Sequence, residues 1–156
     1  MKRLLTLSSL LFLVLASILV TSCEEEVMSN PDVLVVSGLE LAGGQQVPAV
    51  ATTGGGSLDA RYDKASKTLN LTFAWANLSD SVIAIYIQGP AERGAQGPVL
   101  RSFSNFSASR SGAYTIDIPV DEVTFKEAEL LGGAYYINIL TKSQPNGEVR
   151  GQIVFE

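Results

Sequence analysis

The feature that most constrains the fold is the alternation of residue types in "TLNLTFAWA", residues 68–76. Apolar side chains stand at every second position, namely Leu69, Leu71, Phe73 and Trp75. Polar or small side chains occupy the positions between them, namely Asn70, Thr72, Ala74 and Ala76. A period of two puts the large apolar set on one side of a β-strand. The segment therefore predicts a half-buried strand with its apolar face against a core.

Short segments with strand-forming composition recur along the chain between turns rich in Gly, Ser, Asn and Asp. The predicted strands are residues 33–41, 56–63, 68–76, 82–88, 98–103, 113–118, 134–141 and 148–155. Asn146-Gly147 favours positive φ, which predicts a hairpin between the last two strands. Seven or eight short strands at regular spacing predict an all-β fold, either an antiparallel β-sandwich or a Greek-key barrel.

One segment departs from the strand pattern. "VTFKEAELLGG", residues 123–133, carries Thr124 and Glu127 at the spacing of a capping box and ends in Gly132-Gly133. This pattern predicts one short helix near residues 124–131. The predicted core is made of the large apolar residues of the strands: Leu69, Leu71, Phe73, Trp75, Ile85, Ile87, Ile137, Ile139, Ile153 and Phe155.

The N-terminus indicates export. "MKR" supplies positive charge and the apolar run up to Val20 has the length of a signal peptide, although a membrane-spanning anchor of similar length is the alternative. Thr21 and Ser22 precede Cys23, the only cysteine of the chain. This arrangement resembles the bacterial lipobox, which implies cleavage between Ser22 and Cys23 and acylation of Cys23. An ordinary signal peptide with a chance cysteine is the other interpretation.

The predicted organisation is a lipoprotein signal peptide (1–22), an acidic tether (23–32) and one β-domain (33–156). The acidic tether is either a surface-export signal or a plain spacer. Loss of Lys2 and Arg3 leaves nine basic and 16 acidic residues, so the mature net charge is −7. An acidic chain repels phosphates, which argues against nucleic-acid binding and against membrane contact through basic side chains. Membrane contact is therefore expected through the lipid.

Four stretches of the domain resemble the signature stretches of the CHRD (chordin-type) domain. They are "LELAGGQQVPAV" (39–50), "IYIQGPAERGAQGPV" (85–99), "LLGGAYYINILT" (130–141) and "PNGEVRGQI" (145–153). The resemblance implies an immunoglobulin-like or related β-sandwich and brings no established activity. It carries over these candidate positions: Gln46, Val47, Pro48, Tyr86, Gln88, Gly89, Asn138, Gly147, Glu148, Arg150, Gly151 and Gln152.

The chain departs from the family pattern at its histidines. The chain contains none, and Tyr86, Gln88 and Leu140 stand where the family has His. A cluster of imidazoles binds zinc or copper, whereas neutral amides and phenols are poor ligands for these ions. We therefore expect no metal site, no cofactor and no catalytic residue, and we interpret the loop 89–98 as a connection between strands with a solvated Glu92 and Arg93.

Glu148, Arg150 and Gln152 share one face of the last predicted strand, opposite Val149, Gly151 and Ile153. This set is either a polar recognition stripe or a structural network on an edge or outward face, and we favour the structural role. Gly151 inside a strand predicts a bulge or a close approach of backbones. Five tyrosines offer an aromatic surface for a glycan or protein partner, or are scattered in the sandwich: Tyr62, Tyr86, Tyr114, Tyr135 and Tyr136.

Two functional hypotheses follow. The first is a non-catalytic binding or structural domain, anchored by lipid in the bacterial cell envelope at one face of the outer membrane, with an envelope protein or glycan as partner. The second is a metal- or redox-linked envelope enzyme of CHRD type with a degenerate site.

Lipidation of Cys23 is testable by intact mass. Inhibition of the lipoprotein signal peptidase is expected to shift the mass from that of the acylated chain beginning at Cys23 to that of the uncleaved precursor. A mature protein with an unmodified Cys23 thiol would remove the lipid anchor from the account.

Overall fold

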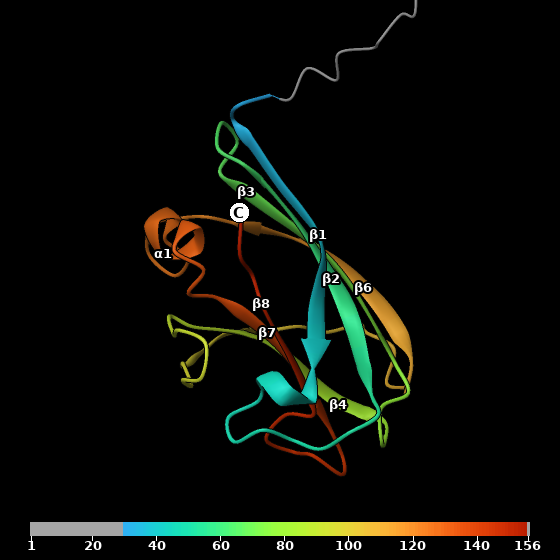
Figure 1. The fold of residues 1–156 in the computed structure, drawn as a ribbon. Helices are drawn as coiled ribbons and strands as arrows, with labels where there is room; N and C mark the ends of the chain where they lie inside the picture. Colours follow the sequence, from blue (N-terminus) through green and yellow to red (C-terminus); the bar gives the residue numbers. More distant parts are fainter. Residues whose placement is uncertain (1–29, 156) are drawn as a thin grey trace, which may run out of the picture.

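The computed structural model describes residues 30–155 of the chain, which form one antiparallel β-domain (Figure 1). The predicted signal peptide, Cys23 and the predicted tether up to residue 29 lie outside the described residues. The elements in chain order are β1 (Val33–Ala42), η1 (Gly43–Gln45), β2 (Gly55–Asp63), β3 (Thr68–Ala76), β4 (Val82–Gln88), β5 (Val99–Ser102), β6 (Gly112–Pro119), α1 (Glu127–Leu131), β7 (Tyr136–Thr141) and β8 (Val149–Gln152). Within this range, no helix combines the length and the apolar character needed to cross a membrane.

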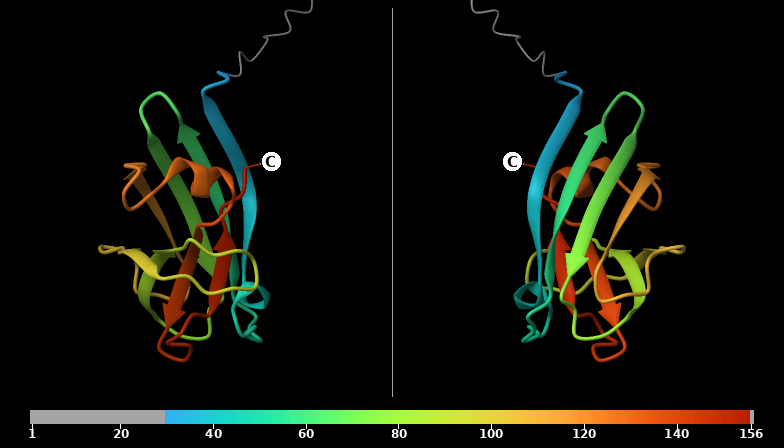
Figure 2. Two further views of the ribbon diagram at one scale, coloured as in Figure 1. Left: turned by 90° about the vertical axis from the view of Figure 1, so that its left-hand side faces the viewer. Right: turned by 90° about the vertical axis from the view of Figure 1, so that its right-hand side faces the viewer.

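The eight strands form a single sheet in the order β5-β4-β7-β8-β1-β2-β3-β6. The sheet curls on itself, so that the wall of β4, β7 and β8 faces the wall of β1, β2, β3 and β6 (Figure 2). The predicted all-β antiparallel architecture with one short helix is thus confirmed. All eight predicted strands are present; two have the predicted ends, and the ends of the others differ by at most three residues.

The core lies inside the curled sheet. Leu69, Leu71, Phe73 and Trp75 of β3 are buried and the residues between them are not, as the alternation predicts. Every residue of the predicted core is buried except Phe155, which is partly buried against the core. Tyr62, Tyr135 and Tyr136 are also buried, which favours the alternative that the five tyrosines are scattered in the sandwich over a shared aromatic surface.

A bulge in β1 keeps its apolar residues pointing inward. In a regular strand Leu34 and Val36 would lie on one face, and Leu39 and Leu41 would lie on the opposite face. The register shifts between Val36 and Leu39, and Gly38 adopts φ +74° there. Because a bulge inserts one residue, it restores Leu39 and Leu41 to the inner face.

Aromatic side chains close the gap between the two ends of the sheet. Within residues 30–155 no backbone ladder joins β5 to β6. Phe103, which follows β5, stacks on Tyr114 of β6 with ring centroids 5.6 Å apart, and it lies 6.2 Å from the ring of Phe73. The Tyr114 hydroxyl also donates to the carbonyl of Ser104 at 2.8 Å. Side-chain packing therefore replaces a strand pairing at this seam.

The helix begins later than predicted, and the capping box is wrong. α1 starts after Lys126, and no side chain caps it there. Instead the carboxylate of Asp121 accepts hydrogen bonds from the backbone N–H groups of Val123, Thr124 and Phe125 at 2.7–3.0 Å. An Asp side chain that bonds the backbone just after it favours a turn over a helix. At the other end, Gly132 and Gly133 terminate α1 as predicted.

Phe103→Ala is expected to lower the free energy of unfolding by about 3–5 kcal/mol, because the side chain is almost fully buried and leaves a cavity at the seam. Val123→Ala is the control, since Val123 is 80% exposed and its loss is expected to change stability by less than about 0.5 kcal/mol. Urea denaturation of the two variants measures the difference. Equal stabilities would show that the seam does not depend on Phe103.

Candidate functional site

The side of the sheet that faces away from the core carries a polar layer on β4, β7 and β8. The register puts Tyr86, Asn138 and Arg150 in one row across these strands, and Gln88, Tyr136 and Gln152 in the next row. The intervening isoleucines, such as Ile87 and Ile137, point into the core. We call the outward set, together with Glu148, the polar layer.

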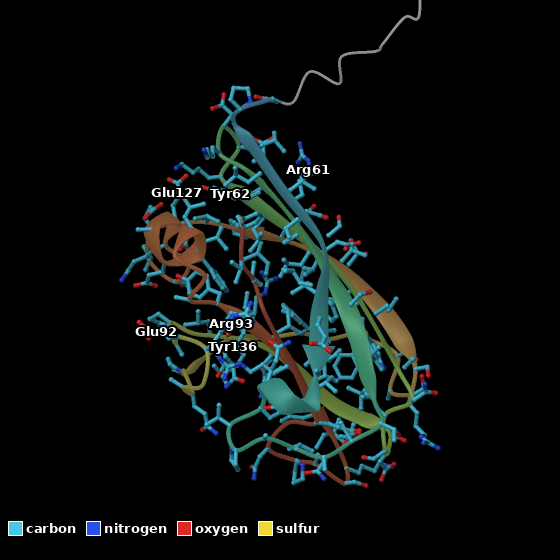
Figure 3. The ribbon with its side chains drawn as sticks, viewed as in Figure 1. Arg61, Tyr62, Glu92, Arg93, Glu127 and Tyr136 are labelled. Carbon is cyan, nitrogen blue, oxygen red and sulfur yellow. The ribbon has the colours of Figure 1, made fainter. Side chains whose placement is uncertain are left out.

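Two loops cover the polar layer and bury most of it, while Tyr86 and Gln88 are partly buried. Glu148, Arg150, Gln152 and Asn138 are exposed by only 0%, 2%, 2% and 6%. One covering segment is residues 43–54, which includes η1, and the other is the loop 89–98 between β4 and β5. Figure 3 shows the side chains of the domain, with Glu92 and Arg93 of the second loop near Tyr136.

Glu148 anchors three other segments to the start of β8. Its carboxylate accepts hydrogen bonds from the hydroxyls of Thr52 and Thr141 at 2.6 Å, and from the hydroxyl and backbone N–H of Ser79 at 2.7 Å. Burial by itself would raise the pKa of Glu148, but the hydrogen bonds from Thr141, Thr52 and Ser79 outweigh burial and hold the pKa below its ordinary value. The buried charge is therefore stabilised by neutral donors.

Arg150 and Gln152 hold the loop 89–98 against the sheet. The Arg150 guanidinium donates to the carbonyls of Ala95 at 2.7 Å and Glu92 at 3.3 Å, and to the Gln152 side-chain oxygen at 2.8 Å. The Gln152 amide donates to the carbonyl of Ala91 at 2.9 Å. The Arg150 guanidinium also lies 3.5 Å from the centre of the Tyr136 ring, a cation–π geometry.

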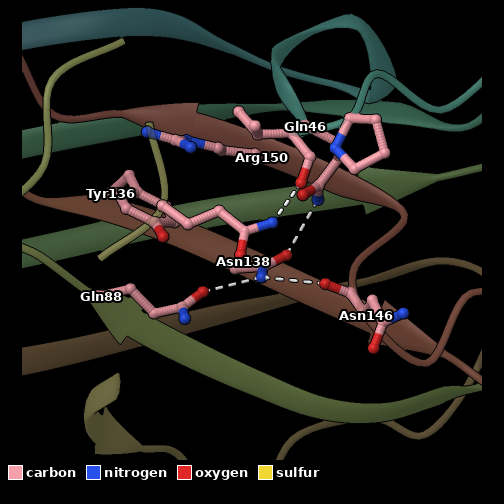
Figure 4. Close-up of a pocket in the computed structure, with 9 residues that line it drawn as sticks. Gln46, Gln88, Tyr136, Asn138, Asn146 and Arg150 are labelled. Carbon is pink, nitrogen blue, oxygen red and sulfur yellow. Dashed lines mark hydrogen bonds between the residues drawn. The ribbon is translucent and has the colours of Figure 1, made fainter. Parts of the chain in front are cut away.

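A chain of amides connects the two covering segments across β7. Gln46 donates to the Asn138 side-chain oxygen at 2.9 Å, and the Asn138 nitrogen donates to Gln88 at 2.7 Å. The same nitrogen lies 3.5 Å from the carbonyl of Asn146 (Figure 4). Asn138 is therefore oriented by partners from three segments of the chain.

A cavity of about 350 Å³ opens between the polar layer and the loops. Its nine lining residues are Gln46, Val47, Pro48, Gln88, Gln96, Tyr136, Asn138, Asn146 and Arg150. A second cavity of about 200 Å³ shares Gln46 and Arg150 with it and is otherwise lined by Gly44, Gln45, Arg93, Gly94 and Gln152. Among the nine lining residues of the first cavity there is no carboxylate, imidazole or thiol. This wall offers amide, phenol and guanidinium groups to a ligand.

Six of the twelve candidate positions from the sequence line the first cavity: Gln46, Val47, Pro48, Gln88, Asn138 and Arg150. Gln152 lines the second cavity. Glu148 lines neither, but its carboxylate holds the covering segment 43–54 through the hydroxyl of Thr52. Tyr86 lies in the row of Asn138 on the same face and lines neither cavity.

Three glycines among the candidate positions permit close contacts. A Cβ on Gly147, which has φ +127°, would lie 2.4 Å from the Asn138 side-chain oxygen. A Cβ on Gly89 would lie 2.5 Å from the carbonyl of Ala134. A Cβ on Gly151 would lie 2.5 Å from Leu41 and 2.8 Å from the carbonyl of Glu40, so Gly151 marks the close approach of β8 to β1. These glycines let the strands and the hairpin support the amide chain.

Two expectations about this region require correction. The last strand is not an edge, because β8 lies between β7 and β1; its polar side chains stand on the outward face, as the other alternative had it, but they are buried under loops. The loop 89–98 does connect two paired strands, and Glu92 and Arg93 are exposed as expected. However, the loop also lines both cavities and supplies carbonyl acceptors to Arg150 and Gln152, so it is more than a turn.

Sequence reasoning missed part of the site. Thr52, Ser79 and Thr141 gave no sequence signal, because each is an ordinary polar residue of a turn or strand end. Tyr136 and Asn146 stood inside the quoted family stretches, but only their contacts identify them as lining residues. Asn138, alone between apolar neighbours in "YINIL", was the strongest available signal of a buried polar position.

The family-histidine positions lie on the outward face. Tyr86 pairs with Asn138, and Leu140 is the next outward residue along β7, while Gln88 follows Tyr86 on β4. Among residues 30–155, no group of three or more His, Cys, Asp or Glu residues is placed to hold a metal ion.

Comparison with known protein families gives a match to the CHRD domain over residues 38–153. The chain belongs to the CHRD domain family. The match begins in β1 and ends just after β8, so it includes both covering segments and the polar layer of the CHRD domain. No curated protein and no solved structure matches the chain.

Glu148→Gln is expected to destabilise the CHRD domain by about 1–3 kcal/mol at neutral pH, because an amide cannot accept the same set of hydrogen bonds. The pKa of Glu148 is lowered in the folded state, so its contribution is present above the unfolded pKa and is lost as pH falls through the lower, folded pKa. Below about pH 4.3 the stability difference between wild type and variant should therefore shrink. Urea denaturation from pH 7 to pH 3 measures it, and a constant difference would contradict the proposed role of the carboxylate.

Proposed function

We propose that this CHRD domain is a non-catalytic binding module of the bacterial cell envelope, held at the outer membrane by lipid on Cys23. Its ligand occupies the amide-rich cavity between the polar layer and the covering loops, and the ligand is a glycan. The single observation that carries the proposal is this cavity, whose volume of about 350 Å³ falls in the range of small-molecule sites, about 300–1,000 Å³.

The lining chemistry supports a saccharide. Gln46, Gln88, Gln96, Asn138 and Asn146 each present a side-chain amide, which has both a donor and an acceptor end. A sugar hydroxyl likewise donates and accepts, so a wall of amides matches a ring of hydroxyls without adding charge. A ligand without hydroxyls would leave the buried amides of the wall unpaired, and that penalty makes such a site specific for ligands that carry hydroxyls.

The preorganisation of the cavity supports binding. Asn138 is fixed by Gln46 and Gln88, and the loop 89–98 is fixed by Arg150 and Gln152. A ligand therefore meets polar groups that are already ordered, so binding loses little further side-chain conformational entropy. The tether and the lipid would set where the cavity is displayed, and the domain itself would supply the recognition.

The proposal predicts that the full mature chain binds envelope saccharides and that the exposed rim residues contribute. Gln96→Ala combined with Asn146→Ala should weaken binding by about tenfold, the loss of one to two neutral hydrogen bonds. Both side chains are exposed at the rim, so the domain is expected to stay folded. Binding to immobilised envelope polysaccharides, followed by titration calorimetry on the saccharides captured, measures the effect.

Gln144→Ala is the matched control. The substitution removes a side-chain amide from the β7–β8 hairpin, as Asn146→Ala does. Gln144 lines neither cavity, so its loss should leave saccharide affinity unchanged. A glycan-binding function would be overturned if wild type bound no saccharide, or if the control and the rim variant weakened binding equally.

A further inference from the structure

The second cavity has a positive wall. Two of its seven lining residues, Arg93 and Arg150, carry guanidinium groups, and none of the seven carries a carboxylate. The predicted mature chain has a net charge of −7, so the charge of this cavity's lining is opposite in sign to the net charge of the chain. Gln46 and Arg150 line both cavities, which makes the two spaces neighbours.

Arg150 is a buried cation without an acidic partner. Its side chain is 2% exposed, and no carboxylate of residues 30–155 forms an ion pair with it. Its three hydrogen bonds go to two carbonyls and one amide oxygen. A guanidinium has five N–H donors, so two of them make no hydrogen bond to the described residues, and the Nε–H among these two is not fully enclosed by protein. A buried charge is costly unless it is paired, and an incoming anion would supply the missing partner.

Arg93 adds a second charge at the entrance. It is exposed and lines the second cavity, whereas the side chain of its neighbour Glu92 lines neither cavity. Burial lowers the pKa of Arg150, and the positive charge of Arg93 lowers it further, in spite of an opposite effect of Tyr136. Both guanidinium side chains line the same cavity, so their positive charges face one space.

We propose that the cavity between Arg93 and Arg150 is an oxyanion subsite, and that it receives the carboxylate of an acidic saccharide. This inference rests on the proposed glycan function and specifies its ligand class. The sugar hydroxyls lie against the amides of the larger cavity, and the acid group reaches the two guanidinium groups, where charge-assisted hydrogen bonds are stronger than neutral ones. Free phosphate has the same oxyanion chemistry but lacks the sugar ring whose hydroxyls would reach the amides of the larger cavity.

The test compares acidic sugars with their neutral counterparts on the full mature chain. Galacturonate is paired with galactose, glucuronate with glucose, and inorganic phosphate is titrated alone and as a competitor, with binding followed by NMR. At least one acid should bind about tenfold more tightly than its neutral partner, the effect of one charged hydrogen bond. Phosphate should bind weakly and displace the acid.

Variants of the exposed Arg93 test the subsite without changing the buried Arg150. Arg93→Gln should reduce the acidic-sugar affinity about tenfold and leave the neutral-sugar affinity unchanged, and Arg93→Lys should retain most of the affinity. Arg101→Gln removes the same charge from β5, lines neither cavity, and should change neither affinity.

Each outcome separates the two proposals. Acidic and neutral sugars that bind equally, or an unchanged acid preference in Arg93→Gln, would overturn the oxyanion subsite and leave the glycan function standing. Phosphate binding without any binding of the acidic sugars would overturn the saccharide assignment. Absence of binding by every sugar and by phosphate would overturn both.

Discussion

A carboxylate immediately before β8 and a guanidinium within it, two residues apart on the same face, are both buried, and neither is neutralised by an opposite charge among the described residues. Glu148 is stabilised by two threonine hydroxyls and by the hydroxyl and N–H of a serine, and Arg150 by carbonyl and amide oxygens and an aromatic ring. Removing one partner of a buried charged network is costly, because the charge is left uncompensated. The loops that supply these partners are therefore fixed to the sheet by charge–dipole contacts, and the cavities exist because the loops are fixed.

The two faces of the same strands have separate tasks. On β7, Ile137 and Ile139 belong to the core, while Tyr136 and Asn138 belong to the polar layer. The hydrophobic effect that stabilises the fold acts on the inner set and leaves the outer set free to be polar. Polar side chains on a sheet face would ordinarily be solvated, but here the segments 43–54 and 89–98 remove them from water. Their hydrogen bonds are therefore made with each other and with the segments that cover them, and the proposed ligand would meet groups that are already oriented.

The sequence predicted what depends on local periodicity. The alternation in residues 68–76 predicted β3 and its buried face, and the four family stretches pointed to positions that line the first cavity. The grouping of Glu148, Arg150 and Gln152 on one face also followed from the strand period. Their burial did not, because the covering segments come from far along the chain. Thr52 and Glu148 are 96 residues apart, and Ala95 and Arg150 are 55 apart. The helix start was wrong for a local reason, since Asp121 competes for the N–H groups that the predicted cap would have used.

The most direct test of the account is an NMR titration that follows the side-chain NH₂ signals of the full mature chain with an acidic saccharide. The account predicts that the signals of Gln46, Gln88 and Asn138, which line the cavity, shift together as the ligand is added, while that of Asn70 on β3 stays constant. Shifts confined to amides outside the cavity, with these three unchanged, would show that the polar layer is a structural network and that the ligand site lies elsewhere.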